Sequence, residues 1–209
     1  MTNRSTFFSR HFGSITAVGI AAAMTVAAVD SASAGPFRFL FGGGGGSNKA
    51  SYSHNASGKR VVPFTKRYSK GTIVVSFADR KLYFVSKPGQ AISYPIGAPM
   101  GKASWSGVLR VSRKQVNPTW TPTAGMRREN PELPAFVPGG HPRNPLGIRA
   151  LYLGSTLYRI HGTDAPWTIG QEVSRGCIRM YNRDVVDLYS RVPVGTKVIV
   201  TWDRFSRRA

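Results

Sequence analysis

A short stretch between residues 161 and 179 carries the side chains that a thiol-based acyl transfer requires. His161 follows an apolar run and lies sixteen residues before Cys177, the only cysteine of the 209-residue chain. A thiol attacks a carbonyl carbon as the thiolate, so it needs a base that accepts its proton or cationic neighbours that favour the anion. The pattern therefore predicts Cys177 as a nucleophile and His161 as its general acid and base.

The residues next to Cys177 fit the same chemistry. Gly176 comes directly before the cysteine, which permits a tight turn and leaves the backbone N–H groups of Gly176 and Cys177 free to bind an oxyanion. Arg175 and Arg179 stand two residues to either side and add positive charge that favours the thiolate. We expect Ser174, Arg175 and Arg179 to bind substrate or to stabilise the thiolate.

Non-catalytic interpretations of these residues stay open at this point. Cys177 could be a small buried hydrophobe, and His161 a structural residue at the end of a strand. Arg175 and Arg179 could form a solvated basic surface. A metal centre is disfavoured, because the sequence contains no close pair of cysteine or histidine residues with zinc-type spacing.

The order of these residues resembles a known active-site motif. The sequence HGT at residues 161–163, followed by SRGCIRM at residues 174–180, resembles the motif of the YkuD-type L,D-transpeptidases. The resemblance covers about residues 71–203. It includes 192–198, which is similar to the way those domains end. Arg175 stands where many members have a histidine, and since a guanidinium is not deprotonated in proteins, any proton transfer at that position is lost.

The resemblance implies a reaction on bacterial peptidoglycan. Cys177 attacks the L-centre carbonyl of meso-diaminopimelate in a tetrapeptide stem, and the terminal D-Ala leaves. His161, oriented by the backbone carbonyl of Gly162, accepts the thiol proton and later gives a proton to the leaving amine. An amine then resolves the thioester, which gives a 3→3 cross-link, exchange of a D-amino acid, or attachment of an outer-membrane protein or lipoprotein. The resemblance implies no cofactor and no metal.

Two other functions remain open. In an L,D-carboxypeptidase-like hydrolase of the same family, water would resolve the acyl-enzyme. In a non-catalytic wall-binding module, Cys177 would be structural; absence of Cys177 or His161 would favour this module, and both residues are present. A papain-like wall peptidase is disfavoured, because those enzymes place the cysteine before the histidine and this chain has the opposite order.

The rest of the sequence predicts a mainly β domain that holds these residues. Asn182 as an N-cap and an apolar stripe over 185–189 predict one helix after the cysteine. The proline-rich stretch 117–145 has little periodicity and predicts a functional loop or lid. The resemblance implies a mixed-sheet β-sandwich with one or two short helices. We expect strands over Thr72–Phe77, Lys81–Val85, Ile92–Ile96, Val108–Ser112, Ala150–Leu153, Leu157–Ile160 and Lys197–Thr201.

The ends of the chain predict export. Residues 1–34 have a basic start, an apolar run of fifteen residues over 15–29 and a small-residue cleavage site, which is typical of a signal peptide. An uncleaved N-terminal anchor is the alternative, although the run is shorter than the roughly 20 residues that span a bilayer. Residues 35–70, which include five consecutive glycines, are expected to form a flexible basic tether, and 204–209 a basic tail.

The charge of the chain agrees with an envelope location. The formal net charge is +20, and in an exported protein such a charge predicts attraction to anionic surfaces of the periplasm or cell envelope rather than to nucleic acid. Exported proteins use cysteine mainly in disulfides, so a lone thiol is unusual there and favours a specific role for Cys177.

Overall fold

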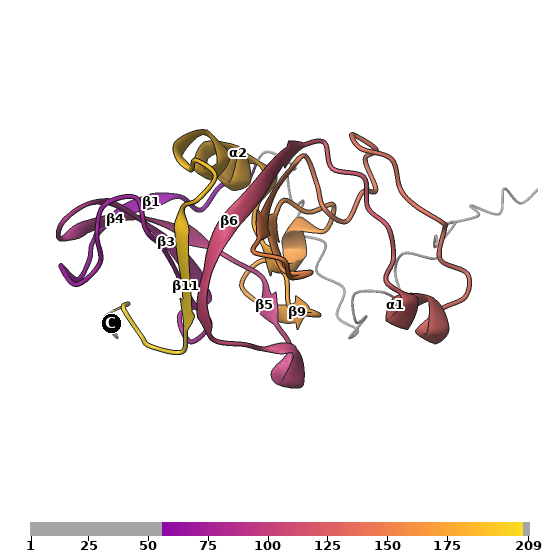
Figure 1. The fold of residues 1–209 in the computed structure, drawn as a ribbon, viewed down its shortest axis with the longest axis horizontal. Helices are drawn as coiled ribbons and strands as arrows, with labels where there is room; N and C mark the ends of the chain where they lie inside the picture. Colours follow the sequence, from indigo (N-terminus) through magenta and orange to yellow (C-terminus); the bar gives the residue numbers. More distant parts are fainter. Residues whose placement is uncertain (1–55, 207–209) are drawn as a thin grey trace, which may run out of the picture. The chain divides into compact units, whose positions relative to one another are not determined.

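The computed structural model describes residues 56–206 (Figure 1). The segments expected to be a signal peptide (1–34) and most of the tether lie outside the described residues, as do residues 207–209. Within the described part, no helix is both long and apolar enough to cross a membrane. The elements are β1 Arg60–Pro63, β2 Ile73–Ser76, β3 Lys81–Lys87, β4 Gln90–Pro95, β5 Ala98–Pro99, β6 Gly107–Val116, α1 Ala124–Glu129, β7 Arg149–Leu153, β8 Arg159–His161, β9 Glu172–Ser174, β10 Ile178–Arg179, α2 Asn182–Arg191 and β11 Lys197–Thr201.

Nine of these strands form one mixed sheet in the order β1-β4-β3-β2-β11-β6-β7-β8-β10. The pairs β2–β11 and β8–β10 are parallel, and the other neighbours in this sheet are antiparallel. Strands β5 and β9 form a separate parallel pair. The predicted fold class, mainly β with a mixed sheet and few helices, is confirmed.

Strand β6 joins the two halves of the sheet. Its first residues pair with β11 and its last residues with β7, and the register shifts between Val111 and Arg113. Such an irregularity bends a strand and increases its twist, and Figure 1 shows β6 crossing the view between the two groups of strands. Strand β8, which ends at His161, and strand β10, which begins directly after Cys177, lie at one edge of the sheet.

A single large core fills the space between the sheet and α2. Helix α2 contributes Val185 and Leu188 from one face, while Val186 is 37% exposed, so the predicted apolar stripe is narrower than the sequence suggested. The helix packs against β7 and β8. Fully buried members of the core, each with less than 1% exposure, include Ile73, Leu82, Tyr94, Ile96, Leu151, Leu153, Ile160, Ile178 and Met180.

The predicted N-cap of α2 is wrong. Tyr181 occupies the N-cap position without a side-chain cap, and Asn182 is the first helical residue. The Asn182 side chain instead accepts a hydrogen bond from the N–H of Thr163 at 3.1 Å and donates one to the Thr163 carbonyl at 3.0 Å. A side chain that pairs with both backbone groups of another segment is no longer free to cap its own helix. Asn182 therefore ties α2 to the chain just after His161.

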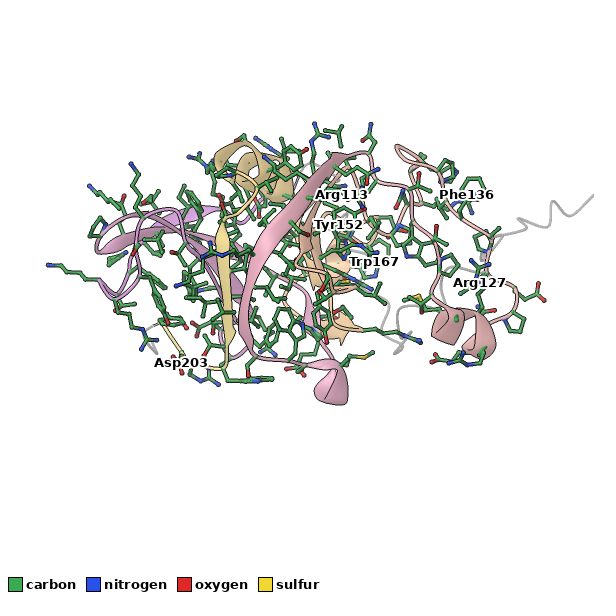
Figure 2. All side chains as sticks on the ribbon, in the orientation of Figure 1. Arg113, Arg127, Phe136, Tyr152, Trp167 and Asp203 are labelled. Carbon is green, nitrogen blue, oxygen red and sulfur yellow. The ribbon has the colours of Figure 1, made fainter. Side chains whose placement is uncertain are left out.

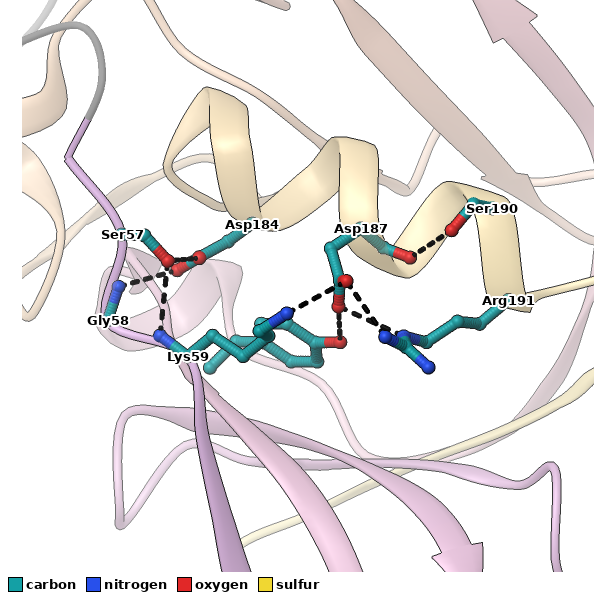
Figure 3. A network of polar contacts seen from close by, with 8 residues as sticks. Ser57, Gly58, Lys59, Asp184, Asp187, Ser190 and Arg191 are labelled. Atoms are coloured by element: carbon teal, nitrogen blue, oxygen red, sulfur yellow. Dashed lines mark hydrogen bonds and ion pairs between the residues drawn. The ribbon is translucent and has the colours of Figure 1, made fainter.

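The tether expected over 35–70 is wrong for its last part. Residues 60–63 form β1 and pair with β4, and Phe64 is buried against the ring of Tyr83 at a centroid distance of 4.8 Å. Ahead of β1, the N–H of Gly58 donates to Asp184 of α2 at 3.0 Å, and Lys59 forms an ion pair with Asp187 at 3.0 Å (Figure 3). The described chain is thus docked on α2 and on the sheet well before residue 71.

The predicted basic tail is also docked where it is described. The ring of Phe205 lies 5.0 Å from that of Phe64, centroid to centroid, and the N–H of Phe205 donates to Asp79 at 2.7 Å. The Ser206 hydroxyl donates to the same carboxylate at 2.5 Å. Hydrogen bonds from this segment lower the pKa of Asp79, against the effect of its partial burial. Aromatic packing thus holds the last part of the expected tether and the described part of the expected tail against the domain.

The proline-rich stretch forms a small unit of its own around α1, which Figure 1 places at the end of a long loop. Its buried apolar residues are Trp120, Leu133, Val137 and Leu146. Asn144 is 1% exposed and donates to the carbonyls of Pro118 and Pro138, at 2.8 and 3.0 Å. These side-chain bonds hold the two ends of the loop together. The stretch therefore has a defined conformation although it contains little regular secondary structure.

Candidate active site

The parallel pair of β8 and β10 positions the predicted site residues. His161 is the last residue of β8, and Cys177 directly precedes β10. In the register of this pair Ile160 lies opposite Ile178, and His161 lies opposite Arg179. Side chains of directly opposed residues share a face and alternate along a strand. Both isoleucines are fully buried in the core, so His161 and Arg179 lie on the other face.

The ring of His161 is 4% exposed and held by its own chain. Its Nδ1 lies 2.6 Å from the carbonyl oxygen of Gly162, the contact that the resemblance implies. A carbonyl oxygen only accepts hydrogen bonds, so Nδ1 carries the proton and donates it. In the neutral ring this leaves Nε2 as a lone-pair acceptor, which is the form that a general base needs.

The surroundings keep this imidazole neutral. Burial, together with the positive charges of Arg179 and Arg159, lowers the pKa of His161 to about 3, although the hydrogen bond to Gly162 opposes this shift. A histidine with this environment binds no proton at neutral pH until one is delivered during reaction. His161 is therefore ready to accept a proton rather than to donate one.

Cys177 is partly exposed, whereas its neighbours Gly176 and Ile178 are buried, and this exposure favours access by a substrate. Its thiol donates to the carbonyl of Leu157 at 3.6 Å, a long sulfur hydrogen bond. Among the described residues, no acceptor receives the backbone N–H of Gly176 or of Cys177. Two free N–H groups beside a nucleophile are the arrangement that stabilises a tetrahedral oxyanion.

Gly176 adopts a conformation and a position in which any other residue would be strained. Its φ is +116°, and a Cβ atom there would lie 2.5 Å from the ring of Tyr158. Tyr158 stacks on Trp105 at a centroid distance of 4.4 Å and an angle of 8°, and the Trp105 indole N–H donates to the Gly176 carbonyl at 3.0 Å. Trp105 and Tyr158 were not predicted from the sequence, because no local pattern connects a tryptophan 71 residues upstream with this turn.

Ser174 supports the same turn from inside. It is 2% exposed, and its hydroxyl donates to the backbone carbonyl of Cys177. The bond closes the loop formed by Arg175 and Gly176. Its position indicates that Ser174 orients the nucleophile through the backbone, whereas sequence analysis proposed contact with substrate or thiolate.

The two arginines of the motif occupy different environments. Arg175 is exposed and forms an ion pair with Glu129 at the end of α1, so it links the proline-rich loop to the segment of the nucleophile. Arg179 is 7% exposed, lies opposite His161, and approaches the Thr168 hydroxyl at 3.5 Å. Burial lowers the pKa of Arg179 to about 10, against the charges of Asp164 and Cys177. It remains a cation at neutral pH.

None of the predicted site residues lines the hollow along α2. The described residues contain no group of three or more histidine, cysteine, aspartate or glutamate side chains that could hold a metal ion. A hollow of about 470 Å³ lies along α2, but no nucleophile paired with a base lines it; its walls are Ser57, Lys59, Ile148, Asn182, Arg183, Asp184, Val186, Asp187 and Ser190.

Comparisons with known proteins agree with the motif. The family model YkuD, described as the L,D-transpeptidase catalytic domain, matches residues 70–200. Two Escherichia coli (strain K12) proteins described as probable L,D-transpeptidases are similar to this chain. ErfK/SrfK is 46% identical over 66% of this chain and 45% of its own length, and YbiS is 46% identical over 60% and 43%. The chain thus matches less than half of the length of each relative.

Some solved structures are also similar to this chain, at low identity. The crystal structure of an Enterococcus faecium L,D-transpeptidase with a C442S substitution matches with a TM-score of 0.49 and 19% identity, over 64% of this chain and 50% of that one. The family model alone spans more than half of the 209 residues and includes the whole region from His161 to Cys177. The chain therefore belongs to the YkuD family of L,D-transpeptidases, which are enzymes.

Proposed function

We propose that this protein is a peptidoglycan L,D-transpeptidase with Cys177 as nucleophile and His161 as general acid and base. The observation that carries the proposal is the state of His161: its Nδ1 is occupied by the Gly162 carbonyl at 2.6 Å, and burial holds its pKa near 3. The base is therefore neutral, with Nε2 free, one strand away from an accessible thiol.

In the proposed first half of the reaction, the Cys177 thiol gives its proton to Nε2 of His161, and the thiolate attacks the carbonyl carbon on the L-centre of meso-diaminopimelate in a tetrapeptide stem. The free N–H groups of Gly176 and Cys177 bind the oxyanion. The imidazolium then protonates the amine of D-Ala as the C–N bond breaks, which leaves a thioester on Cys177. The positive charge of Arg179, buried on the same face, favours the thiolate in the first step.

The second half reverses these proton transfers. An acceptor amine loses a proton to His161 as it attacks the thioester, and the proton returns to the sulfur when the product leaves. The acceptors we propose are the amine of another stem, a free D-amino acid, or an amine of an outer-membrane protein or lipoprotein. Export to the periplasm or cell envelope is part of the proposal and is supported by the signal-like residues 1–34 and the net charge of +20.

Mass spectrometry of purified wall fragments tests the proposal. Disaccharide-tetrapeptides are incubated with the full chain, with and without a D-amino acid, and the products are compared with those of Cys177→Ala and His161→Ala. We expect cross-linked or exchanged stems and loss of D-Ala with the unmodified protein only. Shortened tripeptide stems as the sole product would show a hydrolase instead. Unchanged stems, or unchanged turnover by Cys177→Ala, would contradict the proposed function.

A further inference from the structure

A row of three side chains crosses the sheet on the face that carries the catalytic pair. In the register of the sheet, Arg113 of β6 lies opposite Tyr152 of β7, and Tyr152 lies opposite Arg159 of β8. Arg159 reaches the nucleophile, because its guanidinium donates to the Leu157 carbonyl at 3.2 Å and the Cys177 thiol donates to the same oxygen. The row therefore ends beside the sulfur.

Cation–π contacts hold the two arginines in this row. The guanidinium carbon of Arg113 lies 3.8 Å from the centre of the Tyr152 ring, and that of Arg159 lies 5.2 Å from it. Figure 2 shows Arg113 and Tyr152 near each other beside β6. Gln115 accepts hydrogen bonds from the Tyr152 hydroxyl at 3.0 Å and from Arg113 at 2.9 Å, both on one oxygen. The side chains are thus ordered before any ligand arrives.

The row carries positive charge that the protein itself does not neutralise. Within residues 56–206, the ion pairs with acidic side chains involve neither Arg113 nor Arg159. The Nε–H of Arg159 is buried and has no acceptor in this part of the chain. A buried donor without a partner and two cations around one ring both cost free energy. An anionic ligand would remove both costs.

The chemistry of the row indicates which anion fits. A guanidinium binds carboxylates through two parallel N–H···O bonds in one plane. Neighbouring strands lie about 4.8 Å apart, so the row itself spans roughly 10 Å from β8 to β6, and a ligand that also reaches β10, the strand after Cys177, spans roughly 14 Å. That distance equals about four residues of an extended peptide. A short peptide with carboxylates along its length matches the row better than a single small anion does.

We propose that Arg113, Tyr152 and Arg159 form a subsite that binds carboxylates of a peptide substrate whose reaction takes place at Cys177. The inference rests on the proposed function for the identity of that reaction. It also bears on Arg175, which was expected from the sequence to bind substrate or to stabilise the thiolate. Arg175 is already paired with Glu129, whereas within residues 56–206 the two arginines of the row form no ion pair and each donates only to a neutral oxygen.

Binding to an inactive chain tests the subsite without turnover. The full chain with Cys177→Ala cannot form a thioester, and its affinity is measured by calorimetry for a tetrapeptide stem and for the same stem with its carboxylates converted to amides. We expect roughly tenfold tighter binding of the carboxylate form. Adding Arg113→Gln or Arg159→Gln should reduce this preference severalfold. The matched control is Arg60→Gln, which removes the same charge from exposed β1 at the opposite edge of the sheet and should leave the preference unchanged.

The aromatic ring gives a second variant series that does not change charge. Tyr152→Phe keeps the cation–π surface and should retain most of the preference, whereas Tyr152→Leu removes it and should lose much of the preference. Thermal unfolding is measured for each variant. If Arg159→Gln does not fold, Arg113→Gln and the comparison of Tyr152→Phe with Tyr152→Leu decide whether the row binds carboxylates. Equal affinities for acid and amide stems, or equal preferences in the row variants and in Arg60→Gln, would overturn the proposal.

Exchange assays identify the source of the carboxylate. With the active chain, one arm compares acid and amide forms of the acyl donor, and the other compares a free D-amino acid with its amide as acceptor. If the Arg113 and Arg159 variants lose the preference for the acid form of the acyl donor, the row binds the donor. If they lose the preference for the acid form of the acceptor, the row binds the acceptor. If the active chain gives no product, the proposed function fails, while the binding series on Cys177→Ala still decides whether the subsite exists.

Discussion

The indole N–H of Trp105 donates a hydrogen bond to the carbonyl oxygen of Gly176 at 3.0 Å, across 71 residues of sequence. The same indole stacks on Tyr158 with an angle of 8° between the planes. The carbonyl of Gly176 is thereby turned toward Trp105, and the N–H groups of Gly176 and Cys177 are left without acceptors in the described chain. Trp105 thus acts on the nucleophile through the backbone that presents it.

We expect Trp105→Phe to lower kcat roughly threefold to tenfold with little change in KM. Phenylalanine can keep the stack on Tyr158 but cannot donate to Gly176, and one hydrogen bond contributes about 0.5–1.5 kcal/mol. Steady-state exchange kinetics and thermal unfolding give the two quantities. Trp202→Phe is the control, since Trp202 is half exposed and contacts Phe77 instead of the site. A kcat for Trp105→Phe equal to that of the control would show that the bond has no role.

Replacement of Gly176 by alanine should abolish turnover and lower stability for two separable reasons. The φ of +116° strains any side chain, and the new Cβ would lie 2.5 Å from the Tyr158 ring. In the double variant Gly176→Ala/Tyr158→Leu the contact with the ring is relieved, but the backbone strain remains. We therefore expect partial recovery of the melting temperature without recovery of activity. Full recovery of both would mean that only the contact matters.

The candidate catalytic residues could be predicted from the sequence because they lie close together along the chain. His161, Gly162 and the turn ending at Cys177 fall within seventeen residues, so their types and spacing were visible as one motif. The residues that position them could not be predicted, because they are distant in sequence and only the sheet register and the loop before β6 place them near the site. The pairing of β7 with β6 and with β8 places Tyr152 near the site. A hydrogen bond from its indole N–H to the Gly176 carbonyl brings Trp105 there.

The errors at the edges of the domain have a related cause. Composition predicted a basic tether over 35–70 and a basic tail over 204–209, but one aromatic residue in each range, Phe64 and Phe205, packs with the other on the sheet. Burial of such rings outweighs the average composition of a short segment. The strands β5, β9 and β10 have only two or three residues. A period of two is not detectable over so few positions, and none of the three was predicted.

The neutral, buried His161 predicts how stability depends on pH. The imidazole binds a proton near pH 6.5 in the unfolded chain but near pH 3 in the folded one. Since the folded pKa is the lower one, stability is fully present above about pH 6.5 and is lost as the pH falls toward 3. Between these limits this one group contributes a slope of at most about 1.4 kcal/mol per pH unit.

Urea unfolding of the unmodified chain and of His161→Asn at pH 7.5 and pH 4.5 tests this slope. Asparagine can still donate to the Gly162 carbonyl from the position of Nδ1, but it does not titrate. We expect the variant to lose less stability on acidification than the unmodified chain. Other titrating groups are common to both proteins and cancel in the comparison. Identical losses would show that His161 is protonated in the folded state at pH 4.5.

The contrast between Arg175 and Arg179 leads to a prediction about thiol reactivity. Arg175 is exposed and already paired with Glu129, and exposed charges are screened by water and salt. Arg179 is buried on the same face as His161, and a thiolate at Cys177 would favour its charged form. We therefore expect Arg179→Gln to slow alkylation of Cys177 by iodoacetamide at pH 7 severalfold, and Arg175→Gln to change it by less than about twofold.

Two further variants separate charge from packing in this comparison. Arg179→Lys keeps a buried cation and should recover part of the alkylation rate, which a purely structural role would not predict. Glu129→Gln leaves Arg175 without its partner and should raise the rate slightly, because the anion that offsets Arg175 is gone. Melting temperatures show which variants stay folded. If Arg175→Gln slows alkylation more than Arg179→Gln does, the exposed arginine is the one that favours the thiolate, and the ion pair with Glu129 does not hold it away from Cys177.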